Sequence, residues 1–332
     1  MQPLDFLNDF PYPKTALILG GSGFLGSYLC EQLVDDGWHL TVPTRLYHRA
    51  RHLLPLPTLH LLEANIHDPA VLASLAANHS AVINLVGTLH SDRRPPYGSA
   101  FEQIHVTLPR NLAQACRQAG VKRLIHVSAL GASAQGASFY QRSKAAGEEA
   151  LIQGLAGSSV NWTIFRPSLI FGPGDHFLSS LVRMARYAPV LMLPSPQTLM
   201  QPIYVGDVAQ TIVRALAHPS TYERIYELAG PHSYSLKELA ELVSLWSGHP
   251  RKVLAMPGPV AQAMAGVAVL FSKRPVLTKD QLDMLQSPNV LTTAMAQELQ
   301  LHPTPVEAIL PSALDSHGNY LNYLRGRHAQ RR

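Results

Sequence analysis

The chain has 332 residues, of which 46% are hydrophobic and 15% are charged, so it can form a large globular core and is not disordered as a whole. The net charge of +5 comes without an arginine-rich helix or an aromatic RNA-binding signature, so we expect no nucleic-acid partner. Cys30 and Cys116 are too few for a disulfide framework and are predicted to be buried, reduced thiols. The N-terminus has two acids before Lys14 and no apolar run of the secretory type, so we expect a cytoplasmic protein, with a peripheral position on the inner membrane as the alternative.

Strand-like and helix-like runs alternate through the first half of the chain. The predicted strands cover 15–20, 39–45, 59–66, 81–87, 123–130 and 161–170. The predicted helices cover 24–37, 68–79, 99–119 and 138–153. Such alternation predicts a Rossmann-type α/β fold, a doubly wound parallel sheet whose ligands bind at the carboxyl ends of the strands.

The alternation loosens after residue 172. We expect a dinucleotide-binding domain over 1–172 and a smaller mixed region over 173–332 for a substrate or partner. Strand-like runs at "MQPIYV" and "RIYELAG" make 200–230 a candidate return to the first fold. Further helices are predicted near 207–217, 235–247, 258–271 and 312–324.

A glycine motif follows the first predicted strand. The stretch "LILGGSGFLGSYL" places Gly20, Gly23 and Gly26 between a strand and a helix. In this context the glycines permit a tight turn, close approach of a pyrophosphate and close packing of the helix on the sheet. The helix N-terminus adds free amides and a positive dipole, so the motif predicts a dinucleotide site.

The end of the second predicted strand bears on the type of cofactor. An acid at this position would bind the adenosine ribose of NAD, but the strand ends in Thr44 and Arg45. A guanidinium here suits a 2′-phosphate, so we predict NADP(H) in preference to NAD(H); a solvated basic loop remains the alternative. Asn65 and Ile66, after the third strand, are candidates to flank the adenine.

Tyr140 and Lys144 are four residues apart in the helix predicted after the fifth strand, and so share one face of it. A lysine beside a tyrosine favours the phenolate and lowers the tyrosine pKa, which suits the tyrosine to proton transfer. We therefore treat both residues as candidate catalytic groups, together with Ser128 at the end of the fifth strand.

Several motifs together resemble the extended or atypical short-chain dehydrogenases/reductases, and within them the group around the nucleotide-binding accessory subunit of respiratory complex I and its bacterial homologues. The resemblance spans about residues 14–230 and is carried by "GGSGFLG", "VINLVG", "VKRLIHVSALGA", "YQRSK", "WTIFRPSLIFGPGDHFL" and "QPIYVGDVA". It implies a bound dinucleotide whose contacts are Gly20, Ser22, Gly23, Phe24 and Leu25 at the pyrophosphate, Arg45 at the 2′-phosphate, Val86 and Gly87 near the adenosine, Tyr140 and Lys144 at the nicotinamide ribose, and Pro167, Ser168 and Ile170 near the carboxamide.

Two other positions bear on what the resemblance implies. Redox-active relatives place Ser or Thr at the end of the fifth strand, but our register puts Leu130 there, so turnover is in question. Asp207 follows "QPIYVG" and is predicted to cap a helix rather than to act as an acid.

Residues 253–272 carry no charge and are flanked by Arg251, Lys252, Lys273 and Arg274. Pro257, Gly258 and Pro259 interrupt this segment, so its helical part is too short to span a membrane. We expect either a core helix or a hydrophobic surface that docks on lipid or on a membrane-protein partner.

Three functions remain open from the sequence. The first is a protein that holds NADP(H), associated with respiratory or quinone-related machinery at the membrane. The second is an active NADP-dependent oxidoreductase or epimerase that uses Tyr140 and Lys144 on a small or isoprenoid-like substrate. The third is a redox-sensing regulator that binds the cofactor and a protein partner.

Overall fold

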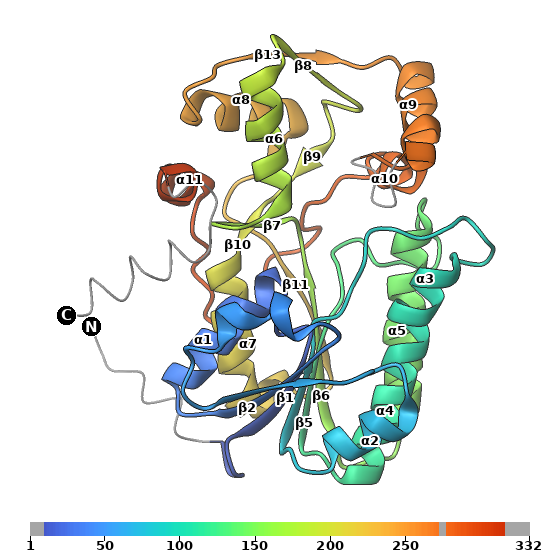
Figure 1. Ribbon diagram of the computed structural model, residues 1–332, viewed down its shortest axis with the longest axis vertical. Coiled ribbons are helices and arrows are strands. Elements are labelled where there is room, and N and C mark those ends of the chain that lie inside the picture. The colour runs from blue at the N-terminus through green and yellow to red at the C-terminus, as the bar shows by residue number, and fades with distance from the viewer. Residues whose placement is uncertain (1–9, 272–276, 316–332) are drawn as a thin grey trace. The chain divides into compact units, whose positions relative to one another are not determined.

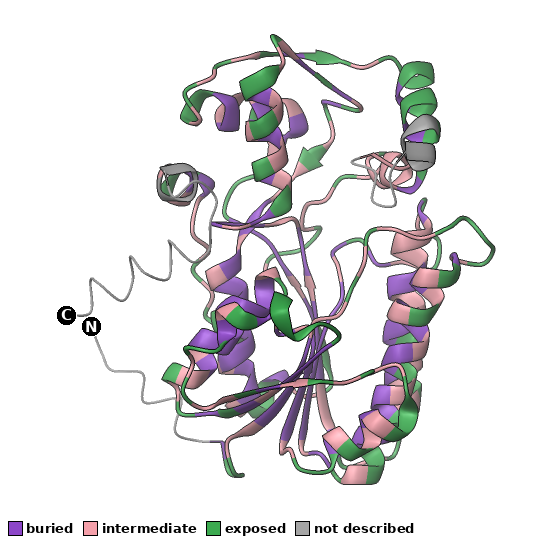
Figure 2. Cartoon of the chain, in the orientation of Figure 1, coloured by how far each residue is buried: buried purple, intermediate pink, exposed green. Residues whose placement is uncertain are grey.

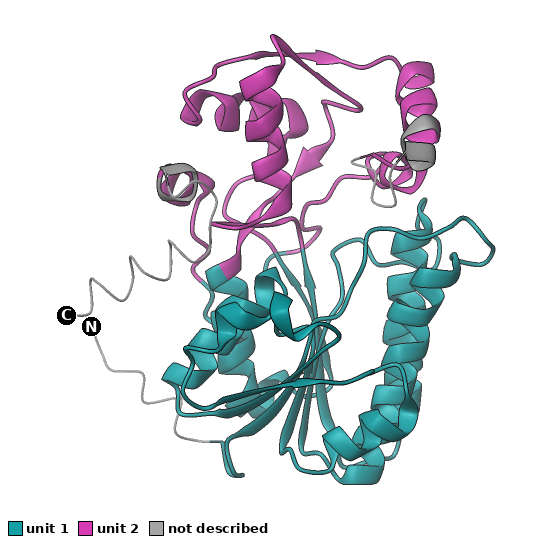
Figure 3. Cartoon of the chain, viewed as in Figure 1, with its two compact units in different colours: residues 1–167, 206–228, 294–301 teal, residues 168–205, 229–293, 302–332 magenta. Residues whose placement is uncertain are grey.

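The computed structural model describes residues 10–271 and 277–315. The chain divides into two compact units (Figure 3). The first combines residues 1–167, 206–228 and 294–301, and the second combines residues 168–205, 229–293 and 302–332. Each unit is therefore assembled from segments that are distant in the sequence.

A seven-stranded sheet forms the centre of the first unit (Figure 1). In chain order its strands are β1 (Thr15–Leu19), β2 (His39–Thr44), β3 (Leu59–Glu63), β4 (Ala81–Asn84), β5 (Arg123–Val127), β6 (Asn161–Pro167) and β11 (Arg224–Leu228). All neighbours pair in parallel, in the spatial order β3–β2–β1–β4–β5–β6–β11. The predicted doubly wound parallel sheet is confirmed, and its order reverses between β1 and β4, where such sheets bind ligands.

Helices cover both faces of this sheet, because each crossover between parallel strands returns over one face. Figure 1 places α1 (Phe24–Asp35) and α7 (Val205–Ala217) on one face. It places α2 (Pro69–Ala76), α4 (Leu108–Ala119) and α5 (Phe139–Leu155) on the other. Short 3-10 turns are η2 (Tyr47–Arg49), η3 (Arg51–Leu53), η5 (Pro219–Thr221) and η6 (Gln297–Leu299).

The single helix predicted over 99–119 is not uniform. It begins as α3 (Ser99–Phe101), continues as the π-helical segment η4 (Glu102–Thr107) and ends as α4. A methyl group on Gly147 of α5 would lie 1.8 Å from the carbonyl oxygen of His105, so α5 packs directly on the backbone of η4. The sequence did not reveal this turn, because apolar periodicity does not separate one π turn from the α turns around it.

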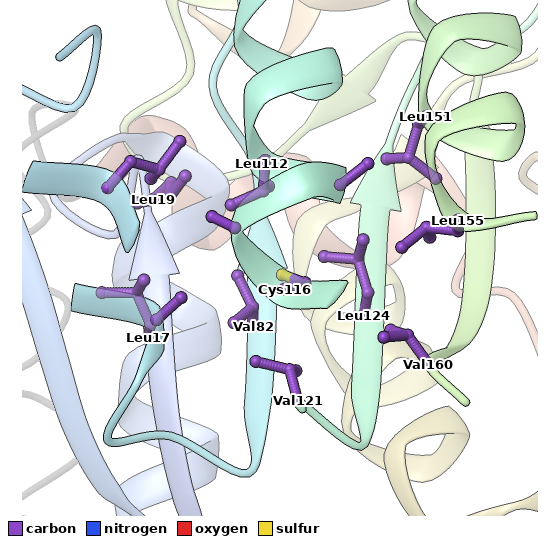
Figure 4. Packing of buried hydrophobic residues seen from close by; sticks show 14 of the residues in the cluster. Leu17, Leu19, Val82, Leu112, Cys116, Val121, Leu124, Leu151, Leu155 and Val160 are labelled. Carbon is purple, nitrogen blue, oxygen red and sulfur yellow. The ribbon is translucent and has the colours of Figure 1, made fainter. Parts of the chain in front are cut away.

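The core of the first unit lies between the sheet and α2, α4 and α5 (Figures 2 and 4). Leu17, Val82 and Leu124 from three adjacent strands meet Leu112 and Cys116 of α4, and all five side chains are buried. Each buried leucine contributes about 1.5–3 kcal/mol relative to an exposed one. These contacts hold the strands in the register that sets the positions of the loops at their carboxyl ends.

Both cysteines are buried and free, as predicted. Burial raises the pKa of the Cys30 thiol far above its usual range and that of Cys116 to about 12. Neither side chain is therefore a thiolate at neutral pH.

The second unit is smaller and mixed. Its strands are β7 (Ile170–Phe171), β8 (Val190–Leu193), β9 (Leu199–Met200), β10 (Ile203–Tyr204), β12 (Tyr234–Ser235) and β13 (Lys252–Ala255), paired as β7–β10, β9–β12 and β8–β13. Its helices are α6 (His176–Tyr187), α8 (Leu236–Trp246), α9 (Gly258–Phe271), α10 (Lys279–Met284) and α11 (Val306–Asp315). Within the described ranges, no helix is long and apolar enough to cross a bilayer.

The last helix differs from its prediction. The helix expected over 312–324 starts earlier, at Val306, and contains Pro311; residues 316–324 lie outside the described part of the chain. Val306 and Leu310 are buried in the core of the second unit. Their packing outweighs the helix-breaking tendency of Pro311, so the helix continues through this residue.

Candidate functional site

The glycine loop after β1 has the backbone that phosphate binding requires. Gly20 has a φ of +81°, which side chains other than glycine rarely adopt. The amide of Gly23 donates to the carbonyl of Gly20 at 2.9 Å and closes the turn. A methyl group on Gly26 would lie 2.4 Å from the same carbonyl, so only glycine allows α1 to pack this closely on the loop.

The N-terminus of α1 is open to a ligand. Gly23 is the N-cap residue, and no side-chain hydrogen bond caps the helix within the described residues. Gly23 is exposed and Ser22 and Phe24 are half-buried, while Leu25 is buried. Free amides at the positive end of a 12-residue helix favour an anion.

The loop after β4 lies against the glycine loop. A methyl group on Gly20 would be 3.2 Å from the backbone nitrogen of Val86, so the two loops touch at the reversal of strand order. The Val86 amide donates to the Asn84 side chain at 3.1 Å, and Gly87 is exposed. The structure thus brings two of the predicted cofactor-binding segments together.

A base follows β2, and an exposed acid ends the neighbouring strand β3. Arg45 is exposed. Partial burial of His67 lowers the pKa of this histidine, and the charge of Arg45 lowers it further. The register of β2 and β3 places Glu63 opposite Thr44, and the Glu63 carboxylate accepts the Tyr47 amide at 2.7 Å. We did not single out Glu63 from the sequence, although aligning two parallel neighbours would have placed it here.

Asn65 and Ile66 follow β3. The Asn65 side chain is exposed and accepts the His67 amide at 3.2 Å, which is a turn contact. Ile66 is half-buried and packs against the core of the first unit. Their predicted place beside an adenine stays a prediction.

Lys144 is the most strongly constrained charged group of the site. The Ser138–Gln141 capping box starts α5 so that Tyr140 and Lys144 follow in its first turns. The Lys144 ammonium is 4% exposed and donates to the Val127 carbonyl at the end of β5, at 3.0 Å. Burial lowers the pKa of Lys144 to about 8, against the opposing effect of Glu148.

Glu148 lies one turn further along α5 and is paired with Arg166 at the end of β6. The Arg166 Nε donates to Glu148 Oε1 at 2.9 Å, and its Nη2 bonds the second carboxylate oxygen. This two-point pairing raises the pKa of Arg166 and fixes the carboxylate. The anionic charge nearest Lys144 is therefore shared with a guanidinium.

Leu130 occupies the position at which we had expected redox-active relatives to carry a hydroxyl. Leu130 is buried, and its amide donates to the Pro167 carbonyl at 2.8 Å. The Ser128 hydroxyl, two residues earlier, is buried and has no hydrogen-bond partner among the described residues. Tyr140, which is half-buried, has its ring edge-on to that of His105 with centroids 5.4 Å apart.

Two buried histidines of the first unit were not found from the sequence. His105 on η4 accepts the Thr88 amide at 3.1 Å, and His126 of β5 contacts the Asn84 side chain at 3.1 Å. Burial and the charge of Lys144 lower the pKa of His126 to about 3, and that of His105 well below its usual range. Isolated histidines in a sequence carry no spacing signal that would reveal such a cluster.

The residues expected near the carboxamide are divided between the two units. Pro167 ends β6 in the first unit, whereas Ser168 and Ile170 belong to the second. The Ser168 hydroxyl donates to the Gln201 carbonyl, and Ile170 pairs with Ile203. Their role toward a ligand stays a prediction.

We had expected Asp207 to be the N-cap residue of a helix, but it is not. Helix α7 already begins at Val205, so Asp207 lies within its first turn, and its carbonyl accepts the Thr211 hydroxyl at 2.8 Å. The strand β10 ends at Tyr204 and runs directly into the helix, which moves the boundary by two residues. An acid in the first turn still complements the helix dipole.

The described residues contain no group of three or more His, Cys, Asp or Glu side chains that could hold a metal ion. The fit to a dinucleotide is better supported by this chain's own geometry. Gly23 leaves the N-terminus of α1 without a side-chain cap, so its amides can donate to a phosphate, and the described residues give the three donors of the buried Lys144 ammonium one acceptor.

Comparison with known proteins supports this interpretation. A profile of the NAD dependent epimerase/dehydratase family matches residues 16–229. The chain is 31% identical over 318 residues to the mitochondrial NADH dehydrogenase [ubiquinone] 1 alpha subcomplex subunit 9 of Mus musculus, covering 92% of this chain and 81% of that protein. It is also 31% identical over 199 residues to a ceramide reductase of Caulobacter vibrioides, covering 59% of each.

A solved structure shares the fold. The UDP-glucose 4-epimerase of Thermotoga maritima superposes with a TM-score of 0.69 at 17% identity, covering 91% of this chain and 97% of that one. At this identity the likeness speaks for the fold alone. The family match covers more than half of the chain and includes every strand of the central sheet except the first residue of β1. The chain therefore belongs to the NAD dependent epimerase/dehydratase family, within the extended short-chain dehydrogenases/reductases.

Proposed function

We propose that this protein binds a nicotinamide dinucleotide at the carboxyl edge of the parallel sheet and prefers NADP(H). The observation that carries the proposal is Lys144, a buried ammonium to which the described residues give one hydrogen-bond acceptor, the Val127 carbonyl. An ammonium has three donors, so two remain for hydroxyl groups such as those of a ribose. The glycine loop on β1 and the loop after β4 supply the phosphate and adenosine sides of the same edge.

The preference for NADP(H) rests on Arg45. It is exposed at the end of β2, where a guanidinium can pair with a 2′-phosphate in two-point fashion. The acid nearest in register, Glu63, already accepts the Tyr47 amide and stabilises the loop after Arg45. We therefore assign Glu63 to the loop rather than to a ribose.

The site is better equipped to hold the cofactor than to turn it over. A bound nicotinamide would supply or accept a hydride. The Tyr140 hydroxyl would exchange a proton with a substrate, and the ammonium of Lys144 would favour its phenolate form. Leu130 provides no hydroxyl to polarise a carbonyl, so we propose slow or absent turnover.

The second candidate function is an active NADP-dependent oxidoreductase or epimerase acting on a small or isoprenoid-like substrate. The Tyr140–Lys144 pair favours it, as does the similarity to a protein named as a ceramide reductase. Replacing Tyr140 with Phe tests this candidate on any turnover that is found. A loss of turnover supports it, and an unchanged rate removes Tyr140 as the proton donor.

The identity of the cofactor is tested first on the purified protein. We expect it to retain, or to bind when titrated, NADPH more tightly than NADH, as measured by protein fluorescence quenching. Arg45→Asp should weaken NADPH binding by about tenfold to a hundredfold, the cost of a lost charge-assisted contact, and leave NADH binding little changed. Arg117→Asp, an exposed arginine on α4, is the matched control. Tighter NADH binding by the unaltered protein would refute the preference.

We also propose that the second unit docks peripherally on an anionic membrane surface, as expected for a protein associated with respiratory or quinone-related machinery. Met192 of β8 and Leu254 of β13 are paired in register and are 44% and 53% exposed. Val260 and Met264, one turn apart on α9, are 44% and 50% exposed. We call these four side chains the apolar patch.

The charge around the apolar patch fits anionic lipid. The segments 176–206 and 242–279, which contain β8, β13 and α9, have no Asp or Glu. Their charged residues are Arg183, Arg186, Arg251, Lys252, Lys273, Arg274 and Lys279. Each basic residue close to an anionic bilayer contributes about 1 kcal/mol, and exposed apolar side chains insert at the interface.

Flotation with liposomes tests this docking. We expect the protein to rise with vesicles that contain an anionic phospholipid and to stay behind with phosphatidylcholine alone. The double variant Leu254→Asp with Met264→Asp should remain at the bottom of the gradient. Leu54→Asp, an equally exposed leucine of the first unit, should float like the unaltered protein. Flotation that the double variant retains would overturn the proposal.

A further inference from the structure

His105 occupies a connecting position in the first unit. It is 2% exposed and lies on the π-helical segment η4, between the loop after β4 and the face of α5 that carries Tyr140. Single π turns are rare and are found frequently at functional sites. Here the π turn brings the backbone of His105 onto Gly147, where any side chain at 147 would clash.

Only one assignment of donors and acceptors is consistent with the hydrogen bonds of the His105 ring. The Thr88 amide can only donate, so His105 Nε2 is the acceptor, at 3.1 Å. The proton of a neutral ring is then on Nδ1, which donates to the Ser143 Oγ at 2.9 Å. The Ser143 hydroxyl in turn donates to the Tyr140 carbonyl at 2.8 Å. Three bonds thus connect the loop at residue 88 to the backbone of Tyr140.

The ring also sets the place of the Tyr140 side chain. It stacks on Phe101, with centroids 5.1 Å apart and planes 15° from parallel. The Tyr140 ring lies at 85° to the His105 ring, with centroids 5.4 Å apart, and at 70° to the Phe101 ring, with centroids 5.9 Å apart. Edge-to-face contacts of this kind are specific in geometry as well as favourable. The phenol is therefore held by packing on its ring and by hydrogen bonding at its backbone.

The surroundings of His105 keep it neutral. The ring is buried and contacts the neutral phenol of Tyr140, and burial together with the charges of two bases, Lys144 and His126, holds its pKa well below the usual range. Glu148, the acid of this region, is engaged with Arg166. A neutral ring is the form that the one-way chain of hydrogen bonds requires.

We propose that His105 is a positioning residue that joins the loop 86–88 to the Tyr140–Lys144 face of α5 through Thr88 and Ser143. The loop proposed to bind the adenosine side and the residues proposed to bind the nicotinamide side are then held in fixed relative positions before a ligand binds. This inference rests on the proposed dinucleotide site for its effect on binding. The connection itself is a property of the free protein.

Hydrogen exchange in the free protein tests the connection without any nucleotide. His105→Asn removes the acceptor for Thr88, so the amides of residues 86–90 and of the first turns of α5 should exchange at least about tenfold faster, by mass spectrometry of peptides. His105→Gln, whose amide oxygen can reach the place of Nε2, should restore protection at 86–90. Unchanged exchange at residues 86–90 in His105→Asn would overturn the proposal.

Nucleotide titration tests the consequence, with a matched histidine as control. His79 bridges the Leu75 carbonyl and the Thr41 hydroxyl at the opposite edge of the sheet, with bonds of 2.7 and 2.8 Å. His105→Asn should weaken NADPH binding by about tenfold, the effect of one lost hydrogen bond, whereas His79→Asn should not change it. Equal affinities in the two variants would refute the positioning role.

Ser143→Ala separates positioning from a general loss of packing. Because Ser143 is the middle of the chain, its effect on NADPH binding should be small once His105 is already Gln. If the effects of Ser143→Ala and His105→Gln on NADPH binding are fully additive, the proposed hydrogen-bond connection is contradicted. If the unaltered protein binds no dinucleotide, the proposed function fails, while the exchange measurement still decides the connection.

Discussion

Replacing Lys144 with Met should make the protein more stable at pH 7, although it removes a side chain from the proposed site. The folded-state pKa of Lys144 is about 8, against an ordinary value of 10.5, because the ammonium is buried. Each unit of pKa difference corresponds to 1.36 kcal/mol, so keeping this lysine charged in the folded state costs about 3 kcal/mol at pH 7. The Val127 carbonyl loses its partner in the variant, which costs about 1 kcal/mol, so the net gain is about 2 kcal/mol.

The sign of the pH dependence follows from the direction of the shift. The pKa is lower in the folded state, so between pH 8 and pH 10.5 the unfolded chain binds more protons. The contribution of Lys144 to the free energy of unfolding is therefore least favourable below pH 8. It becomes more favourable as the pH rises from 8 to 10.5. The advantage of Lys144→Met should shrink over the same interval.

Urea unfolding followed by circular dichroism at pH 7 and pH 9.5 measures both effects. Lys237→Met is the control, because the Lys237 side chain is 44% exposed and its pair with Glu241 at 3.9 Å contributes little. The same Lys144 variant should bind NADPH more weakly than the unaltered protein. A variant that is less stable at pH 7, or an advantage that does not change with pH, would refute the assignment of Lys144 as a strained, ligand-directed ammonium.

Three further predictions concern the first unit. Gly26→Ala puts a methyl group 2.4 Å from a carbonyl, so it should destabilise the fold by about 1–3 kcal/mol and abolish dinucleotide binding, whereas Gly258→Ala, with open space around it, should do neither. Arg123→Met leaves the buried acceptors of β6, α7 and η5 without their donor, and should lower the unfolding free energy by about 3 kcal/mol or more in a urea titration. Cys30 and Cys116 should react with a thiol reagent at neutral pH only as fast as the protein unfolds, and rapid labelling of the folded protein would contradict their burial.

Local signals were sufficient for most of the fold. The strand and helix runs of the first half follow from apolar periodicity, and two of these helices begin beside Asp68 and Ser138, whose side chains bond amides of their own helix ends. The same signals placed the glycine loop, because its chemistry depends on a few consecutive residues. The start of α11 was missed, since burial of Val306 and Leu310 outweighs the local effect of Pro311.

The residues of the candidate site also fall into two groups, those that a local motif predicts and those whose partners are distant in the sequence. Gly20, Arg45 and Lys144 could each be predicted, because each belongs to a motif or follows directly from a strand end. Glu63 and His105 belong to no such motif, since Glu63 bonds Tyr47 of η2, 16 residues away, and His105 bonds Ser143 of α5, 38 residues away.

The class of fold, the buried free cysteines and the position of the glycine loop can be predicted from the amino-acid sequence, because they depend on periodicity and on residues adjacent along the chain. The contacts that join the loop after β4, the π turn and α5 depend on the tertiary structure. It also decided that Lys144 is buried beside two neutral histidines, with its nearby acid committed to Arg166. The physical reason is that hydrogen-bond partners and desolvation depend on which distant segments the sheet brings together, and a lysine acquires its altered pKa only when that packing removes it from water.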